Sequence, residues 1–494
     1  RDSRREQAMA RDSDVRVTGA ALWLLPVRMR VPLKFGAQVM TSVTCARVAV
    51  EVEARGGQRA VGWGETPLSV VWGWPSNADF GAREQAMIRL AAACCRGIVA
   101  TGERGHPLEI GATFRQGTLD GLARESDDPA LGEPIPELAT LICSSPVDLA
   151  VHDAFGVVHG VDTYSTYGRA HLTRDLASFF GRPDDTRFRD RFPADFLVAH
   201  PPRRLPAWHL VGGLDPLANA DLTGDEPQDG HPVTLEQWIE TDGLTCLKVK
   251  LRGTDLGWDV DRLVRVGDVG IPRGVRHFCA DFNCTVHDPA YVLAALDAVA
   301  AARPEVAARL LYVEQPFPYD LAAHPIDVHA IAARTRLFLD ESAHDWRHIE
   351  EGRRLGWNGV ALKTCKTQSG ALLALAWARA HGMDVMVQDL TNPMLAVIPH
   401  LRLAAHAGTL AGVETNGMQY YPEASAPEAA VHPGAYRRRG GSVDLGTFTG
   451  PGFGQRVTEI GRALPEPACV AGSIAIETLP GSRGFRRPMT GATT

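Results

Sequence analysis

The sequence lacks a hydrophobic run long enough to cross a membrane, because its apolar N-terminal stretch at residues 21–27 is short and is ended by Pro26. It also lacks an excess of positive charge. The formal net charge is −7, which gives no electrostatic footprint for nucleic acid or an anionic membrane. The first 16 residues are charged and lack the apolar core of a secretory signal. We therefore expect a disordered tail over residues 1–16, and no membrane or nucleic-acid partner.

Cysteine pairs at the spacing of zinc ligands are absent as well. The nine cysteines are odd in number and scattered, which argues against a disulfide framework and favours a reducing, cytoplasmic location. Cys246, Cys279 and Cys365 each lie two residues from a lysine or an aspartate. If these residues are on strands, the cysteines share their inward face. We interpret them as small apolar fillers of a barrel interior, with a thiolate metal site as the remote alternative.

The length of 494 residues, with 45% hydrophobic and 22% charged content, is typical of a large enzyme with two domains. Residues 17–65 alternate like antiparallel strands, and residues 83–100 and 145–160 show helical spacing. The expected domains are an α+β capping domain at 17–204 with an irregular excursion at 161–204, a β/α barrel at 205–435, and a C-terminal segment at 436–494 that returns to the capping domain.

Five short apolar segments in the middle of the chain each stop on an ionisable residue. They read LTCLKVKL, HFCADFN, LLYVEQP, RLFLDES and GVALKTC, and their tips are Lys248 with Lys250, Asp281, Glu314, Asp340 and Lys363. Successive tips lie 23 to 33 residues apart, about one strand-plus-helix unit. Three further strand-like segments, LPAWHLVG, DVMVQDL and AGVETN, bring the total to eight. This α/β pattern predicts a parallel barrel whose strand ends build an active site.

Three of the tips are carboxylates, and a buried carboxylate is costly unless it is paired or bound to a metal. All-oxygen ligation by Asp281, Glu314 and Asp340 suits Mg²⁺, with Mn²⁺ as the second choice. Glu341 follows Asp340 directly, and strand alternation points it to the opposite face, so we prefer Asp340. The structural alternative is that each carboxylate caps a helix or forms a salt bridge at the barrel mouth.

Lysines accompany these acids from two sides. Lys248 and Lys250 are two residues apart and share one face of a strand, and two nearby cations lower each other's pKa, which lets a lysine act as a base. Lys363 comes four strands later and is expected to face the same cavity from the opposite side. Lys366 follows in a loop, where we expect a solvated side chain. A solvent-facing edge strand is the alternative interpretation of the first pair.

The set KVK, DFN, VEQP, LDES and ALKTCK, in this order, resembles the enolase superfamily, specifically its muconate lactonizing enzyme-like branch. The resemblance covers about residues 17–455 and includes PVDLAVHDAFGVVHG, which is similar to a capping-domain helix. It implies a modified (β/α)7β barrel of the TIM type with an α+β cap. The mandelate racemase branch has an Asp at position 363 and a His after the seventh strand; that dyad is absent here.

By position, the resemblance makes the three carboxylates the Mg²⁺ ligands. It makes Lys250 the base, Lys248 a neighbour that lowers its pKa, and Lys363 the acid/base group on the opposite side. Asn283 is similar to an asparagine that orients a substrate or a metal-bound oxygen. Asp389 and Glu414 are further strand-end acids that bind substrate or satisfy the lysines, and the eighth strand, GVETNG, lacks the DxD pattern of dipeptide epimerases.

The implied reaction is Mg²⁺-dependent removal of a proton α to a carboxylate through an enediolate, by a racemase, epimerase or cycloisomerase. A dehydratase (lyase) acting on an acid sugar or another hydroxy acid, and a non-catalytic carboxylate-binding barrel, are the alternatives. The expected partner is a small carboxylate, and a homo-oligomer is expected. Specificity is expected in cap loops around residues 34–36 and 68–72, where Trp72 and Trp74 offer apolar contacts or pack under the cap.

Overall fold

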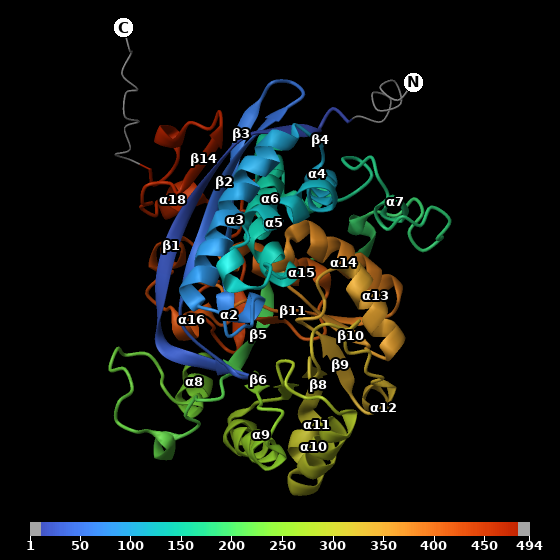
Figure 1. Cartoon of the computed structure of the whole chain (residues 1–494). Helices are drawn as coiled ribbons and strands as arrows, with labels where there is room; N and C mark the ends of the chain where they lie inside the picture. Colours follow the sequence, from blue (N-terminus) through green and yellow to red (C-terminus); the bar gives the residue numbers. More distant parts are fainter. Residues whose placement is uncertain (1–10, 483–494) are drawn as a thin grey trace.

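The computed structural model describes residues 11–482, and Figure 1 shows an antiparallel sheet with helices on one face, set above a β/α barrel. The strand order of the sheet is β14–β1–β2–β3, and β4 pairs with β1. Its strands are β1 (Val15–Phe35), β2 (Gln38–Ala54), β3 (Arg59–Pro67), β4 (Arg104–Gly105) and β14 (Cys469–Gly472). Residues 1–10 of the expected tail lie outside the described residues, and β1 already begins at Val15.

Two long helices cover one face of this sheet. They are α3 (Phe80–Thr101) and α6 (Glu137–His159). Gly62 and Gly64 allow β3 to pack closely against α6, since a Cβ at either position would lie within 2.1 Å of the α6 backbone. α6 is long and apolar enough to span a membrane by length and composition, but 83% of its most apolar window is buried inside the protein. It is therefore the core helix of the capping domain. Shorter helices complete this layer: α2 (Val70–Gly73), α4 (Pro107–Phe114) and α5 (Asp120–Ser126).

The barrel has eight parallel strands in the order β11–β10–β9–β8–β7–β6–β5–β12. Because β11 and β12 stand at the two ends of this order, the barrel is nearly closed. The strands are β5 (Arg204–Val211), β6 (Cys246–Lys250), β7 (His277–Asp281), β8 (Leu310–Glu314), β9 (Arg336–Leu339), β10 (Gly359–Leu362), β11 (Asp384–Val387) and β12 (Val413–Glu414).

Helices follow the barrel strands on the outside (Figure 1). They are α8 (Leu235–Asp242), α9 (Leu256–Gly270), α10 (Pro289–Ala302), α11 (Pro304–Arg309), α12 (His329–Ala332), α13 (Trp346–Leu355), α14 (Gln368–Ala380) and α15 (Val397–Ala407). Each strand therefore returns to a parallel neighbour through a crossover, as the spacing of the strand tips predicts.

Side chains inside the barrel form two successive layers. The lower layer is an apolar cluster of Trp208, Cys246, Cys279, Tyr312, Phe338 and Met386. Adding two residues on each strand gives the upper layer of Leu210, Lys248, Asp281, Glu314, Asp340 and Gln388, because side chains alternate with period two. The interpretation of Cys246 and Cys279 as interior fillers is confirmed, and all nine cysteines are free. Cys365 is also buried, but it packs against the capping domain.

The hairpin of β1 and β2 reaches from the cap to the mouth of the barrel, which Figure 1 shows as a long blue ribbon descending toward β5 and β6. Its tip docks on the loop after β5, where the Gly213 amide donates to the Lys34 carbonyl oxygen over 3.0 Å. Arg30 pairs with Asp229 at 2.7 Å. The C-terminal segment returns in the other direction, since β13 (Ser442–Asp444) pairs with β5 and β14 pairs with β1.

Residues 161–204, expected to be an irregular excursion, consist of loops and short helical segments, including α7 (Leu176–Phe179). Its aromatic side chains are buried, among them Tyr167, Phe180 and Phe188. Phe180 packs edge-on against Trp346 of α13, with ring centroids 4.9 Å apart. The segment is thus packed against the barrel helices.

Candidate active site

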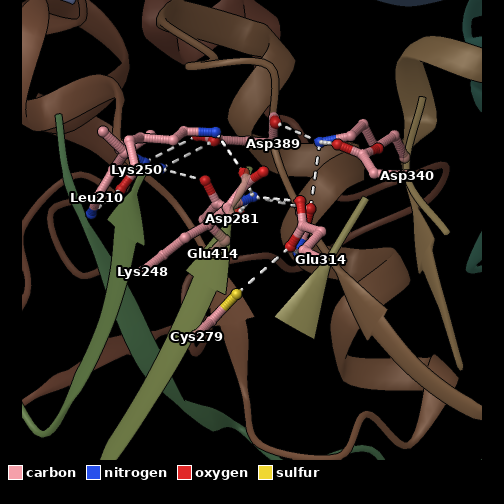
Figure 2. Close-up of polar contacts among 12 residues, drawn as sticks. Leu210, Lys248, Lys250, Cys279, Asp281, Glu314, Asp340, Asp389 and Glu414 are labelled. Carbon is pink, nitrogen blue, oxygen red and sulfur yellow. Dashed lines mark hydrogen bonds and ion pairs between the residues drawn. The ribbon is translucent and has the colours of Figure 1, made fainter. Parts of the chain in front are cut away.

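Lys248 lies at the centre of the upper layer and contacts carboxylates from three other strands (Figure 2). Its Nζ is 2.6 Å from Glu314 Oε1, 2.9 Å from Glu414 Oε2 and 3.2 Å from Asp281 Oδ2. Burial alone lowers the pKa of a lysine, but these carboxylates raise the pKa of Lys248 well above its usual value. Without a metal, Lys248 is therefore a fixed cation inside the carboxylate group.

Lys250 follows at the end of β6 and turns toward the same group. Its Nζ donates to Asp281 Oδ2 over 2.5 Å, and it lies 5.8 Å from the centroid of the Phe35 ring on the hairpin. Burial raises the pKa of Asp281, but Lys250 and Lys248 lower it more, so the carboxylate stays charged. Asp281 and the two lysines are all buried.

Lys363 and Lys366 approach Asp340 from the end of β10. Lys363 Nζ lies 3.2 Å from Asp340 Oδ2, and Lys366 Nζ lies 3.4 Å from Asp340 Oδ1. The expectation that Lys366 is solvated is wrong, because it is only 4% exposed and also donates to the Asp340 backbone carbonyl. Burial lowers the pKa of Lys366. For Lys363, burial acts in the same direction, but Asp340 raises the pKa above its usual value.

Gln388 is a site residue that the sequence interpretation missed. Its Oε1 accepts from Lys248 over 3.1 Å and from Lys363 over 3.4 Å, and its Nε2 donates to Glu314 Oε2. The amide thus connects lysines that enter from opposite sides of the barrel. The signal was present in the sequence, because Gln388 stands two residues after the inward-facing Met386 of β11.

Glu341 also lies at the site, and the expectation that it points to the opposite face is wrong. β9 ends at Leu339, and Asp340 directly after it still faces inward, but strand alternation no longer governs Glu341. Glu341 Oε1 accepts from Asn283 Nδ2 over 3.0 Å and from Trp72 Nε1 over 3.1 Å. Burial raises the pKa of Glu341 to about 7, and Asp340 adds to this effect.

Asp389 and Glu414 come together between the ends of β11 and β12. The Asn416 side chain links them, because its Nδ2 donates to Glu414 Oε1 over 2.7 Å and to Asp389 Oδ1 over 3.3 Å. Burial raises the pKa of Asp389 to about 6, and the nearby Glu414 contributes to the rise. Two neighbouring carboxylates therefore border the cavity opposite the metal-type ligands.

One cavity beneath the hairpin collects six of these groups. Together with the solvent space at its mouth it spans about 400 Å³. Its charged residues are Lys248, Lys250, Asp340, Lys363, Asp389 and Glu414. Its apolar wall consists of Leu33, Phe35, Met40, Trp72, Leu210 and Leu390, so both expected cap loops contribute. Lys363 Nζ also lies 5.2 Å from the centroid of the Trp72 ring.

The three expected metal ligands fit Mg²⁺ by their chemistry. Glu314 is fully buried, and burial raises its pKa to about 8, with Asp281 and Asp340 adding to the rise. Such mutual repulsion is what a hard divalent cation relieves, and carboxylate oxygens are its preferred ligands. In the structure the ammonium of Lys248 lies between Glu314 and Asp281 and partly neutralises them.

Known proteins share sequence and fold features with this chain. Residues 233–460 match the family model described as Enolase C-terminal domain-like. An aromatic dipeptide epimerase from Herpetosiphon aurantiacus is 25% identical over 263 residues, which cover 52% of this chain and 68% of that protein.

Two solved structures extend the likeness to the cap. A muconate lactonizing enzyme from Mucobacterium Smegmatis, complexed with muconolactone, has a TM-score of 0.58 and 15% identity, covering 89% of this chain and 96% of that one. A dipeptide epimerase from Cytophaga hutchinsonii, complexed with Mg and a dipeptide, has a TM-score of 0.53 and 16% identity, covering 83% and 89%. These likenesses show the fold. Residues 233–460 are thus similar to the enolase C-terminal domain, and the solved structures share the fold of the barrel with its cap.

Proposed function

We propose that this chain is a Mg²⁺-dependent racemase or epimerase that moves a proton at the carbon α to a carboxylate. The observation that carries the proposal is that Lys250 and Lys363 line one cavity from different sides. They come from the ends of β6 and β10, which are separated in the barrel by three strands. A 1,1-proton transfer needs one group to remove the proton from one face and another to return it on the other face.

Each of the two lysines stands beside a carboxylate. Lys250 Nζ lies 2.5 Å from Asp281 Oδ2, and Lys363 Nζ lies 3.2 Å from Asp340 Oδ2. Asp281, Glu314 and Asp340 would hold Mg²⁺, whose positive charge would offset these anions and stabilise the negative charge that develops on the substrate. Lys248 adds a fixed positive charge beside them. Gln388 Oε1 accepts hydrogen bonds from both Lys248 and Lys363 and so holds the two side chains in position.

The walls of the cavity favour a substrate with an apolar or aromatic group and a cationic group. Phe35, Met40 and Trp72 form an apolar surface, while Asp389 and Glu414 form an acidic one. A dipeptide with a free ammonium group meets both requirements. The eighth strand lacks the DxD pattern, but Asp389 from the neighbouring strand stands beside Glu414 through Asn416. The named activity of the Herpetosiphon relative, aromatic dipeptide epimerisation, supports this class.

The test is exchange of the α-hydrogen in D₂O, measured separately for each stereoisomer of an aromatic dipeptide with Mg²⁺ present. Lys250→Ala is expected to abolish exchange from one stereoisomer, and Lys363→Ala from the other. Lys366→Ala is the matched control, because Lys366 also contacts Asp340 but does not line the cavity. It is expected to reduce exchange from both stereoisomers equally.

The same experiment separates the other reactions of the superfamily. If one lysine dominates exchange from every substrate, the reaction is an elimination or a cycloisomerisation, and acid sugars and other hydroxy acids become the panel to screen. If the double variant Lys250→Ala/Lys363→Ala keeps near-normal exchange, the lysine-pair mechanism is wrong and the base lies elsewhere, with Asp389 and Glu414 next to be tested.

A further inference from the structure

A second group of metal-type ligands lies at the seam between the capping domain and the barrel. Glu137 begins α6 of the cap, while His344 and His348 belong to the β9–α13 connection and to α13 of the barrel. Their ligand atoms all lie within 4.8 Å of one another. We propose that Glu137, His344 and His348, named here the seam cluster, form a structural site for a borderline transition-metal ion, with Zn²⁺ as the best fit.

The distances match those of a tetrahedral site. Glu137 Oε2 lies 3.1 Å from His344 Nδ1 and 3.6 Å from His348 Nε2. Zn²⁺ bound tetrahedrally at about 2.0–2.1 Å sets its ligand atoms about 3.3–3.4 Å apart. These two distances bracket this value, and the ligand atoms of His344 and His348 lie within 4.8 Å of each other. The Glu137 oxygen is therefore placed to share an ion with both histidines.

The surrounding hydrogen bonds hold the ligands in the orientation that metal binding requires. His348 Nδ1 lies 3.1 Å from Asp345 Oδ1, which leaves Nε2 directed to Glu137. A carboxylate that fixes the second ring nitrogen is the usual support of a metal-bound histidine. Arg115 contacts the other oxygen of Glu137 at 2.9 Å and Asp345 Oδ2 at 3.2 Å, which leaves Oε2 to the two histidines.

One nitrogen of the His344 ring is without a hydrogen-bond partner in the described part of the chain. His344 is 7% exposed, and this nitrogen, Nε2, is buried. The ring's own hydrogen bond in this part of the chain is the one to Glu137. Glu137 and His348 have side-chain exposures of 45% and 31%. The cluster is therefore open to solvent on one side, which gives an ion its entry path and a water its place as fourth ligand.

The ligand chemistry distinguishes this site from the barrel mouth. Two imidazoles and one carboxylate suit Zn²⁺, whereas three carboxylates suit Mg²⁺. His344 lies four residues after Asp340 in the same connection. An ion at the seam cluster would therefore tie α6 of the cap to the loop that carries Asp340 and Glu341. Its expected role is to fix the cap on the barrel, independently of which reaction the enzyme catalyses.

The experiment uses the full-length protein, stripped of metal and then saturated with Mg²⁺ to fill the barrel mouth. Equimolar Zn²⁺ is expected to bind with a stoichiometry of one per chain by elemental analysis and to raise Tm by a few degrees. Co²⁺ in place of Zn²⁺ is expected to give the intense visible absorption of a four-coordinate ion with nitrogen ligands. His348→Ala and, as a second variant, Glu137→Gln are expected to lose all three signals.

His329→Ala is the matched control, since His329 also pairs with a carboxylate, Asp327, but stands exposed on α12. It is expected to keep all three signals. Zn²⁺ binding that survives in both seam variants, or that is lost when Mg²⁺ is added, would assign the ion to the barrel mouth and overturn the proposal. No Zn²⁺ retained after gel filtration and no change in Tm would show that the cluster is an ion-pair network only.

Discussion

The two layers inside the barrel differ sharply although they are only two residues apart on each strand. The lower layer packs Trp208, Tyr312 and Phe338 around cysteine and methionine, while the upper layer brings lysines and carboxylates together at nearly zero exposure. Apolar packing stabilises a fold directly, whereas a buried ion pair is often no better for stability than an apolar pair of the same shape. The difference indicates that the lower layer maintains the barrel and the upper layer serves the reaction.

A cavity-creating substitution in the lower layer is expected to have the largest effect on stability. Phe338→Ala removes a fully buried ring that packs against Tyr312 with centroids 4.5 Å apart. We expect a loss of about 3–5 kcal/mol in the free energy of unfolding, the usual cost of such a cavity. Urea titration followed by circular dichroism measures it. A loss below about 1 kcal/mol would show that the lower layer can collapse around the cavity.

The upper layer is expected to show the opposite behaviour. Burial raises the pKa of Glu314, so its charge is costly in the metal-free protein, and glutamine keeps the shape of the side chain without that charge. Glu314→Gln is therefore expected to lower kcat a hundredfold or more, about 3 kcal/mol in activation free energy, with less than about 1 kcal/mol lost in stability. Turnover with Mg²⁺ and urea titration of the metal-free protein measure the two effects. A large loss of stability with little loss of kcat would reverse the assignment of the layers.

Chelation is a second test of the different roles of the two layers. Removing divalent ions is expected to abolish turnover, and added Mg²⁺ to restore it, while the far-ultraviolet circular dichroism stays unchanged. The barrel core contains no ion-dependent contact in the lower layer, as far as the described residues show. Full activity after chelation would contradict the assignment of Asp281, Glu314 and Asp340 as ligands.

A buried histidine beside Glu414 is expected to make the stability of the protein sensitive to acid. His400 Nε2 lies 2.7 Å from the Glu414 backbone oxygen, and burial lowers the pKa of His400 to about 4. In the unfolded chain a histidine titrates near 6.5, so the unfolded state binds the extra proton first as pH falls. Stability is therefore expected to fall between about pH 6.5 and 4, by up to about 3 kcal/mol for this one group. Urea titrations at several pH values measure the slope, and His400→Gln is expected to reduce it by about one proton.

A small change in the lower layer tests whether its cysteines are only fillers. Cys279 Sγ lies 3.7 Å from Glu314 Oε2, so it touches the boundary between the layers. Cys279→Ala is expected to cost about 1 kcal/mol in stability, and to leave kcat within about twofold. A large fall in kcat would show that the thiol contributes to the upper layer.

Much of the barrel could be predicted from the sequence because alternation on short buried strands is a local rule. The inward direction of Lys248, Asp281 and Glu314 follows from this rule. The same rule, applied to the inward-facing Met386, predicts that Gln388 faces inward as well. Glu341 and Lys366 were misplaced because each follows the end of a strand, where a loop sets the direction of the side chain.

The seam cluster could not be predicted from the sequence. His344 and His348 stand four residues apart, a spacing that metal-binding histidines often have, but Glu137 lies 207 positions before His344 and no sequence pattern joins it to them. Their proximity depends on how the cap docks on the barrel, and no local pattern in the chain encodes this docking. The pairing of Asp389 with Glu414 has a similar origin, since it forms where the barrel fails to close between β11 and β12.

The long hairpin of β1 and β2 has a consequence for how such an enzyme can change its substrate. Leu33, Phe35 and Met40 line the cavity from this hairpin, whereas every lysine and carboxylate of the cavity comes from the barrel. Selection acting on the hairpin can therefore alter which molecules are accepted without disturbing the proton-transfer groups. The chain keeps the apolar contacts of the hairpin apart from the proton-transfer groups of the barrel, so a lineage can explore new substrates one apolar side chain at a time.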